Sequence, residues 1–304
     1  MADYWTGKDI LSSRDVSKEA IEQIWSKAKK YEDAVEKKKT YNRLSGKVLA
    51  SLFFEPSTRT QFSFQTAMQR LGGSLIAFSD KDTTSVAKGE TLYDTIKMVE
   101  SCADVIVIRH SLEGAAKLAA DAAQIPVING GDGANQHPTQ ALLDTYTIFQ
   151  QKGKIDGQTI TLIGDLKNGR TIHSLCYALS NFDCTIELWS PPQLKIPQAI
   201  VNDISEKVKV VELESLDFSD SDVVYATRIQ KERFDDPEEA KRYSYVIDAE
   251  MVRSMKDDAI IMHPFPRVDE IATEVDQMPQ AKYFQQEANG IPVRMAILES
   301  VLGG

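Results

Sequence analysis

Short apolar runs alternate with amphipathic stretches along the whole chain, and this alternation limits the possible folds more than any other feature. Residues 47–54 are too few for a helix between their flanks and predict a buried strand. Glu55-Pro56 and a helical pattern that ends at Gly72-Gly73 follow directly. Strands that alternate with helices lie parallel, because each helix returns the chain to the same end of the sheet. The sequence therefore predicts an α/β fold of parallel sheets flanked by helices.

The alternation occurs in two series, which the polar, glycine-bearing residues 151–158 separate. A chain of 304 residues is long enough for two domains with separate cores. We expect domains at 1–150 and 151–286, with a last helix within 287–304 that packs back on the first domain. The predicted strands are 47–54, 74–78, 104–109 and 126–128, then 159–163, 185–189, 208–211, 223–227 and 259–262. The predicted helices of the first series are 16–39, one ending at Leu71, 90–101, 113–123 and 138–151.

Composition excludes several classes of protein. Lys and Arg number 35 against 45 Asp and Glu, and a net charge of −10 argues against binding to nucleic acid or anionic membranes. The first ten residues lack the apolar core of a signal peptide, and no run approaches the ~20 apolar residues of a membrane span. The three cysteines form no C-x-x-C pair, so neither a disulfide framework nor a zinc ribbon is supported. We expect a cytoplasmic protein.

Polar residues follow the first predicted strand, where Ser57-Thr58-Arg59-Thr60 opens a helix. In open parallel sheets ligands bind beyond the carboxyl ends of the strands, where helix N-termini present N–H groups. Three hydroxyls and a guanidinium at that place suit an anion with several oxygens, most simply a phosphate. The alternative is an ordinary helix cap beside a solvated arginine.

Two further segments of the first series end at the same edge. Arg109-His110 ends a strand, and residues 135–140 open a helix. His137, Arg109 and Thr60 could surround a carbonyl oxygen on which negative charge grows during an addition. His137 alone would be interpreted as a core or capping residue, and it is the convergence of the three segments that favours a site.

The second series repeats the pattern, with residues 164–171 after one strand and 227–233 after another. Arginines at strand ends in both halves indicate a cleft that holds a second anion, one with carboxylates. The prolines of segment 263–267 predict a rigid loop at its edge. The four histidines are never spaced i, i+4, and the Gly164-Asp165-Leu166 turn lacks the G-x-G-x-x-G pattern, which weakens metal and dinucleotide interpretations.

Four segments closely resemble the aspartate carbamoyltransferase family, within the aspartate/ornithine carbamoyltransferase superfamily: FEPSTRT at 54–60, QHPTQ at 136–140, GDLK at 164–167 and HPFPRVDE at 263–270. The resemblance covers essentially the whole chain, in order. It implies transfer of the carbamoyl group of carbamoyl phosphate to L-aspartate in pyrimidine biosynthesis, giving N-carbamoyl-L-aspartate and phosphate. It also implies an active site in the cleft between the domains, no metal or organic cofactor, and a homotrimer with shared sites. Whether regulatory chains join the trimer stays open.

The resemblance assigns roles residue by residue. Carbamoyl phosphate would be bound by Ser57, Thr58, Arg59, Thr60, Arg109, His137 and Gln140, the backbone carbonyls of Phe265 and Pro266, and Ser85 of a neighbouring subunit. Aspartate would be bound by Arg170, Arg228, Gln230 and the neighbour's Lys88. The residues with catalytic roles would be Arg59, Thr60, Arg109, His137 and Lys88. Salt links among Glu55, Arg170 and Arg233 would hold the two domains closed.

Two departures from the family pattern stand out. The loop around Lys88 is one residue shorter than usual, which weakens the assignment of Ser85, and Phe265 replaces the usual leucine. Three alternatives remain beside the main prediction. An ornithine carbamoyltransferase would carry a cysteine in an H-C-L-P motif, where this chain has His263-Pro264-Phe265-Pro266. A silent anion-binding subunit would lack catalytic donors, and a nucleotide-dependent oxidoreductase or kinase would need a glycine fingerprint.

Overall fold

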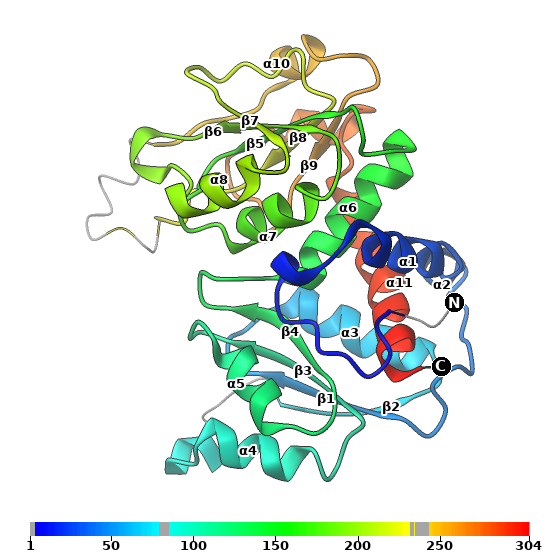
Figure 1. Cartoon of the computed structure of the whole chain (residues 1–304). Coiled ribbons are helices and arrows are strands. Elements are labelled where there is room, and N and C mark those ends of the chain that lie inside the picture. The colour runs from blue at the N-terminus through cyan, green and yellow to red at the C-terminus, as the bar shows by residue number, and fades with distance from the viewer. Residues whose placement is uncertain (1–3, 79–84, 232–233, 235–242, 304) are drawn as a thin grey trace. The chain divides into compact units, whose positions relative to one another are not determined.

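The computed structural model describes residues 4–78, 85–231, 234 and 243–303 (Figure 1). The chain divides into two compact units, the first formed by Met1–Tyr146 with Ala288–Gly304 and the second by Thr147–Glu287. The division falls inside helix α6 (Pro138–Lys152), a few residues before the predicted boundary near Gln151. Each unit is built on one sheet, and the strands of both sheets are parallel.

The first unit holds a four-stranded sheet in the order β2-β1-β3-β4. Its core consists of aliphatic side chains on β1, β3 and the helices that cover them, among them Leu52, Ile106 and Ile96. The strands are β1 (Val48–Phe53), β2 (Ser74–Phe78), β3 (Val105–His110) and β4 (Val127–Asp132). The helices are α1 (Lys18–Lys29), α2 (Asp33–Glu36), α3 (Thr58–Arg70), α4 (Leu92–Val99), α5 (Ala115–Ala122) and the first part of α6.

The second unit holds a five-stranded sheet in the order β7-β6-β5-β8-β9. Buried apolar residues such as Val224, Ile261 and Tyr245 form its core. The strands are β5 (Thr159–Ile163), β6 (Thr185–Trp189), β7 (Lys209–Glu212), β8 (Val223–Ala226) and β9 (Ile260–Met262). The helices are α7 (Arg170–Leu179), α8 (Gln198–Ser205), α10 (Ala249–Arg253) and α11 (Tyr283–Leu302), the last of which ends in the first unit.

The predicted parallel α/β fold is therefore confirmed, with three corrections. The helix expected over 16–39 is two helices, which a turn at residues 30–32 separates. The second ends before Lys38, whose left-handed φ of 49° cannot continue a helix. Strand β4 runs on to Asp132, since the polar segment after Ile128 is buried and hydrogen bonded rather than a loop. Helix α11 begins at Tyr283 and passes through Pro292, where burial of residues such as Tyr283 and Val293 offsets the lost hydrogen bond.

The parallel order places the carboxyl ends of neighbouring strands at one edge of each sheet. In the first unit this edge carries the ends of β1, β3 and β4, and in the second the ends of β5, β8 and β9. Gly164, directly after β5, has a φ of 114°, and a Cβ atom there would lie 2.1 Å from the Thr227 carbonyl oxygen after β8. Only glycine allows these two strand ends to approach so closely. Within the described ranges, no helix is both long and apolar enough to cross a membrane.

Candidate active site

The turn between β1 and α3 presents hydroxyls and the N–H groups of the first helical turn at the carboxyl edge of the first sheet. Ser57 is extended and makes no side-chain capping bond, while its carbonyl accepts the first helical bond, from Gln61 N at 3.0 Å. The N–H groups of Thr58, Arg59 and Thr60 therefore precede the helical hydrogen bonds and carry the positive end of the helix dipole. Thr58 and Arg59 are exposed, and Thr60 is buried. Such a turn can bind a phosphate-like anion.

Arg109, at the end of β3, is held rigidly beside this turn. Its Nη2 donates to Glu55 Oε1 at 2.7 Å, and its Nη1 donates to the Gly130 carbonyl at 3.1 Å. Two fixed partners hold the guanidinium in one orientation. Glu55 thus pairs with an arginine of its own unit in this structure. Its proposed link to Arg170 and Arg233 across the domains stays a prediction, and Arg233 lies outside the described residues.

His137 lies at the start of α6 and is 3% exposed. Its Nε2 lies 3.5 Å from Thr60 Oγ1, and its Nδ1 lies 3.5 Å from Thr139 Oγ1. The structure thus brings together Thr60 and His137, which are 77 residues apart in the sequence. One turn further along α6, Gln140 Nε2 donates to Asp144 Oδ1 at 2.9 Å, so the Gln140 carbonyl oxygen is the group suited to accept a substrate hydrogen bond.

In the second unit, Asp165 ties the loop after β5 to the loop after β8. Its Oδ1 accepts a hydrogen bond from Asn168 N at 3.0 Å, and its Oδ2 accepts one from Gln230 N at 3.2 Å. Arg228, half-buried, stands on the loop after β8, and Arg170, also half-buried, is the first residue of α7, directly after the loop that follows β5. Sequence reasoning quoted Asp165 only as part of a motif. Its position just after a buried strand could have pointed to it, because a buried carboxylate needs hydrogen-bond donors around it.

The segment after β9 forms a loop that a buried His263–Glu270 pair closes. Phe265 N donates to His263 Nδ1 at 2.9 Å, so the ring proton lies on Nε2, which donates to Glu270 Oε1 at 2.6 Å. Between these anchors Phe265 has a φ of 51°, the left-handed region that side chains rarely adopt. The pair therefore fixes the backbone on which the carbonyls of Phe265 and Pro266 stand.

Lys88 ends a short 3-10 turn, Ser85–Lys88, and is exposed. This turn lies in the first unit, between β2 and α4. An exposed lysine on a turn can serve a site on another copy of the chain. The contribution of Ser85 and Lys88 to a neighbouring subunit stays a prediction.

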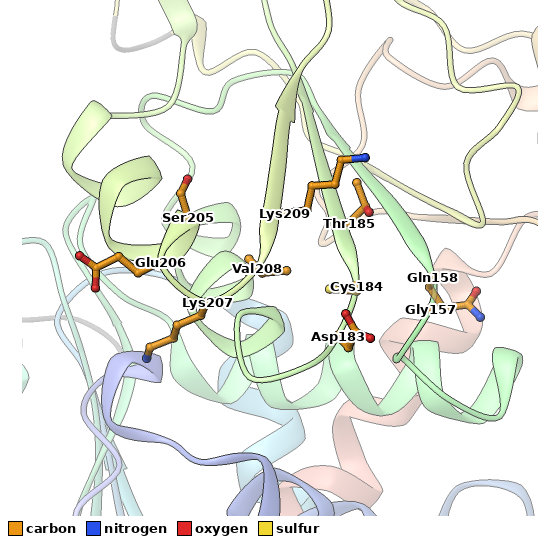
Figure 2. A pocket seen from close by; sticks show the side chains of 10 residues that line it. All are labelled: Gly157, Gln158, Asp183, Cys184, Thr185, Ser205, Glu206, Lys207, Val208 and Lys209. Carbon is orange, nitrogen blue, oxygen red and sulfur yellow. The ribbon is translucent and has the colours of Figure 1, made fainter.

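A cavity of about 500 Å³ opens at the other edge of the second sheet (Figure 2). Residues 157–158, 183–185 and 205–209 line it, at the amino ends of β5, β6 and β7. None of these residues was predicted for the site. Because ligands of open parallel sheets bind at the carboxyl ends of the strands, this cavity is not the candidate active site.

Both sheets are parallel, and their carboxyl edges carry hydroxyl, guanidinium and imidazole groups. This arrangement is typical of α/β enzymes that bind small anions. Models of known protein families identify the family within this class. The carbamoyl-P binding domain of aspartate/ornithine carbamoyltransferase matches residues 8–150, and the Asp/Orn binding domain of the same family matches residues 156–301. The chain belongs to the aspartate/ornithine carbamoyltransferase family, which confirms the resemblance seen in the sequence.

Individual relatives agree with the family assignment. The aspartate carbamoyltransferase catalytic subunit of Thermococcus kodakarensis is 54% identical, over 98% of this chain and 98% of its own. The catalytic subunit of aspartate transcarbamoylase from M. jannaschii is 52% identical, with a TM-score of 0.90 over 97% of this chain and 98% of its own. Aspartate transcarbamoylase from Trypanosoma cruzi, in complex with carbamoyl aspartate and phosphate, is 42% identical with a TM-score of 0.93, over 99% of this chain and 98% of its own.

The His263–Glu270 pair generates a prediction about acid stability. Burial raises the pKa of the Glu270 carboxyl, but the His263 hydrogen bond and neighbouring backbone N–H groups outweigh burial, so the pKa lies below its ordinary value of 4.5. The ionised carboxyl therefore stabilises the fold above that value, and this contribution is lost as the pH falls through the lower folded-state pKa. We expect Glu270→Gln to lower the free energy of unfolding by about 1–3 kcal/mol at neutral pH.

The test is urea unfolding of the wild type and Glu270→Gln from about pH 7 down to about pH 3. The difference between them should shrink below about pH 4. The control is Glu250→Gln, which changes an exposed carboxylate and should differ little from the wild type at any pH. A difference for Glu270→Gln that stays constant with pH would contradict the account.

Proposed function

We propose that this chain transfers the carbamoyl group of carbamoyl phosphate to the α-amino group of L-aspartate, giving N-carbamoyl-L-aspartate and phosphate, the carbamoylation used in pyrimidine biosynthesis. The observation that carries the proposal is the edge of the first sheet, where the turn at Ser57, the fixed Arg109 and the Thr60–His137 contact come together. The T. cruzi relative, of nearly the same fold, is in complex with carbamoyl aspartate and phosphate, the two products of this reaction.

We assign phosphate binding to the turn between β1 and α3. The hydroxyls of Ser57, Thr58 and Thr60 and the N–H groups of the first helical turn offer neutral donors to phosphate oxygens. Arg59, exposed on the same turn, adds a cation, and Arg109 adds a second one. Charge-assisted hydrogen bonds of this kind are about twice as strong as neutral ones.

The carbamoyl carbonyl is polarised by Thr60, Arg109 and His137, which donate to the oxygen as the amine adds. In the step, the aspartate nitrogen forms a bond to the carbonyl carbon, and the bond from that carbon to the phosphate oxygen breaks. The amine proton leaves with the phosphate, so no side chain serves as general base and no covalent nucleophile is needed. Gln140 and the carbonyls of Phe265 and Pro266 accept from the carbamoyl NH₂ group. Catalysis then consists of positioning and oxyanion stabilisation.

Aspartate is bound by the second unit, through Arg228 and Gln230 on the loop after β8 and Arg170 at the start of α7, and Asp165 joins the segments that carry them. Two arginines and an amide suit two carboxylates. We accordingly assign carbamoyl phosphate to the domain of residues 1–150 and aspartate to the domain of residues 151–286. The position of the active site in a cleft between the domains stays a prediction, as does domain closure by Glu55, Arg170 and Arg233.

The alternative amine, ornithine, is less well supported. Cys176 and Cys184 are buried, and burial raises the pKa of the Cys176 thiol and raises the pKa of Cys184 to about 12. Both are distant in sequence from His263-Pro264-Phe265-Pro266, where the ornithine enzymes carry their cysteine. Pro264 stands in this chain at the motif position of that cysteine.

We further propose a homotrimer whose sites take Ser85 and Lys88 from a neighbouring copy. Large apolar side chains are exposed on the first unit: Phe62 on α3, Ile76 on the edge strand β2, and Tyr93 and Met98 on α4. Exposed apolar groups beside an unpaired sheet edge are typical of a surface that another chain covers. The relatives are named catalytic subunits, which supports regulatory chains as further partners. We place the enzyme in the cytoplasm.

Replacing Arg59 tests the phosphate site. Arg59→Ala removes a cation at the first turn of α3 and should lower kcat/KM for carbamoyl phosphate about 100- to 1,000-fold. Arg70→Ala, in the last turn of the same helix, is the matched control and should stay within about twofold of the wild type. The measurement is phosphate release under saturating aspartate. Equal rates for the two variants would place the phosphate elsewhere.

Mixing two inactive variants tests shared sites. Arg59→Ala and Lys88→Ala chains, unfolded together in equal amounts and refolded, form mixed trimers in which one site of three has both residues intact. Random assembly predicts recovery of about one quarter of the wild-type activity. The control is each variant refolded alone. No recovery in trimers shown by mass spectrometry to be mixed would mean that each chain completes its own site.

A further inference from the structure

A carboxylate that the sequence analysis did not single out ends strand β4. Asp132 is 2% exposed and accepts four hydrogen bonds, two on each oxygen. Its Oδ1 accepts from Asn129 Nδ2 at 2.8 Å and from Gln136 N at 3.1 Å. Its Oδ2 accepts from Gly114 N at 2.8 Å and from Asn135 Nδ2 at 3.0 Å. We propose that Asp132 is a positioning residue that fixes His137 and Arg109 for carbamoyl transfer.

The link to His137 runs through the backbone. Gln136, which directly precedes His137, donates its N–H to the Asp132 carboxylate and accepts the Asp132 N–H on its carbonyl at 3.2 Å. Asp132 therefore holds both polar backbone groups of the residue before the imidazole. The contacts of the His137 ring nitrogens with Thr60 and Thr139 are long, at 3.5 Å each, so the backbone that Asp132 holds contributes to the position of the imidazole.

The link to Arg109 runs through Asn129 and Gly130. Asp132 orients the Asn129 amide, whose Oδ1 in turn accepts a hydrogen bond from Gly131 N at 2.8 Å. These bonds fix the backbone on both sides of Gly130, whose carbonyl accepts from Arg109 Nη1 at 3.1 Å. Gly133 N also donates to the His110 carbonyl at 3.0 Å, next to Arg109. The Asp132 carboxylate thus positions His137 and Arg109, two of the three groups proposed to polarise the substrate carbonyl.

The four bonds require a carboxylate rather than an amide. Each Asp132 oxygen faces one backbone N–H, Gln136 N on one side and Gly114 N on the other. An asparagine has one amide oxygen and one NH₂ group, so either orientation points its NH₂ at a backbone donor that cannot become an acceptor. Asp132→Asn keeps the size of the side chain but must displace one of these two segments.

The inference rests on the proposed roles of His137 and Arg109. The experiment distinguishes a wrong role for Asp132 from a wrong role for His137. We compare Asp132→Asn with His137→Gln and with Asp104→Asn. Asp104 is the matched control, because it accepts Val48 N at 2.8 Å at the other edge of the same sheet. We expect Asp132→Asn to lower kcat/KM for carbamoyl phosphate at least about 30-fold per folded enzyme, because a misplaced catalytic group is costly. Asp104→Asn should stay within about threefold.

The second readout is NMR of ¹³Cε1-labelled histidine, with the His137 resonance assigned by its loss in His137→Gln. In Asp132→Asn the His137 resonance should shift or broaden, while the His263 resonance, in the other unit, keeps its position. Should Asp132→Asn fail to fold, Asn135→Ala removes one of the four donors from an exposed position and should move the same resonance by less. A merely structural role would lower the unfolding midpoint without moving the His137 resonance.

The outcomes are distinct. Wild-type kcat/KM and an unmoved His137 resonance in Asp132→Asn, with His137→Gln impaired, would overturn the role of Asp132 alone. Wild-type activity in His137→Gln would instead overturn the proposed role of His137, and with it the inference built on that role. Equal loss of kcat/KM in Asp132→Asn and Asp104→Asn would show a general effect of lost stability.

Discussion

Parallel hydrogen bonding between strands is the constraint on which the rest of the molecule depends. It brings the carboxyl ends of β1, β3 and β4 to one edge of the first sheet, and those of β5, β8 and β9 to one edge of the second. Residues far apart in sequence, such as Thr60 and His137, meet only because the strands before them share a direction. Polar groups at such an edge can be rigid, since the strands below them are buried.

Rigidity at these edges comes from buried carboxylates as much as from apolar packing. Asp132 ends β4, Asp165 follows β5 closely, and Glu270 closes the loop after β9. Each accepts hydrogen bonds from the backbone of the loop it holds. A carboxylate is the side chain best able to satisfy several N–H donors at once. The chain as a whole is acidic, yet these acidic groups face amide and imidazole donors and leave the arginines at the edges to bind anions.

Periodicity in the sequence was enough to predict both sheets, because strand and helix patterns differ and the runs are short. It misplaced the end of β4, since Asn129 and Asp132 look like loop residues until their mutual hydrogen bond is known. It also joined α1 and α2 into one helix that ran to residue 39, because neither the turn at residues 30–32 nor the left-handed φ of Lys38 leaves a mark in the pattern.

Part of the candidate site was likewise predictable from the sequence, and part was not. The turn at Ser57 and the helix at His137 were predictable from their place after strands, whereas the role of each residue came from the family resemblance. The pairing of Arg109 with Glu55 and the anchoring by Asp132 depend on side-chain geometry, which no spacing in the sequence encodes.

Choice of the acceptor amine tests the central claim most directly. The purified chain should be given carbamoyl phosphate with either L-aspartate or L-ornithine, at equal concentration, and phosphate release measured for each. We expect rapid release with aspartate and at least about 100-fold slower release with ornithine, because we assign Arg170 and Arg228 to the two carboxylates of aspartate. No release with aspartate, or equal release with both amines, would contradict it.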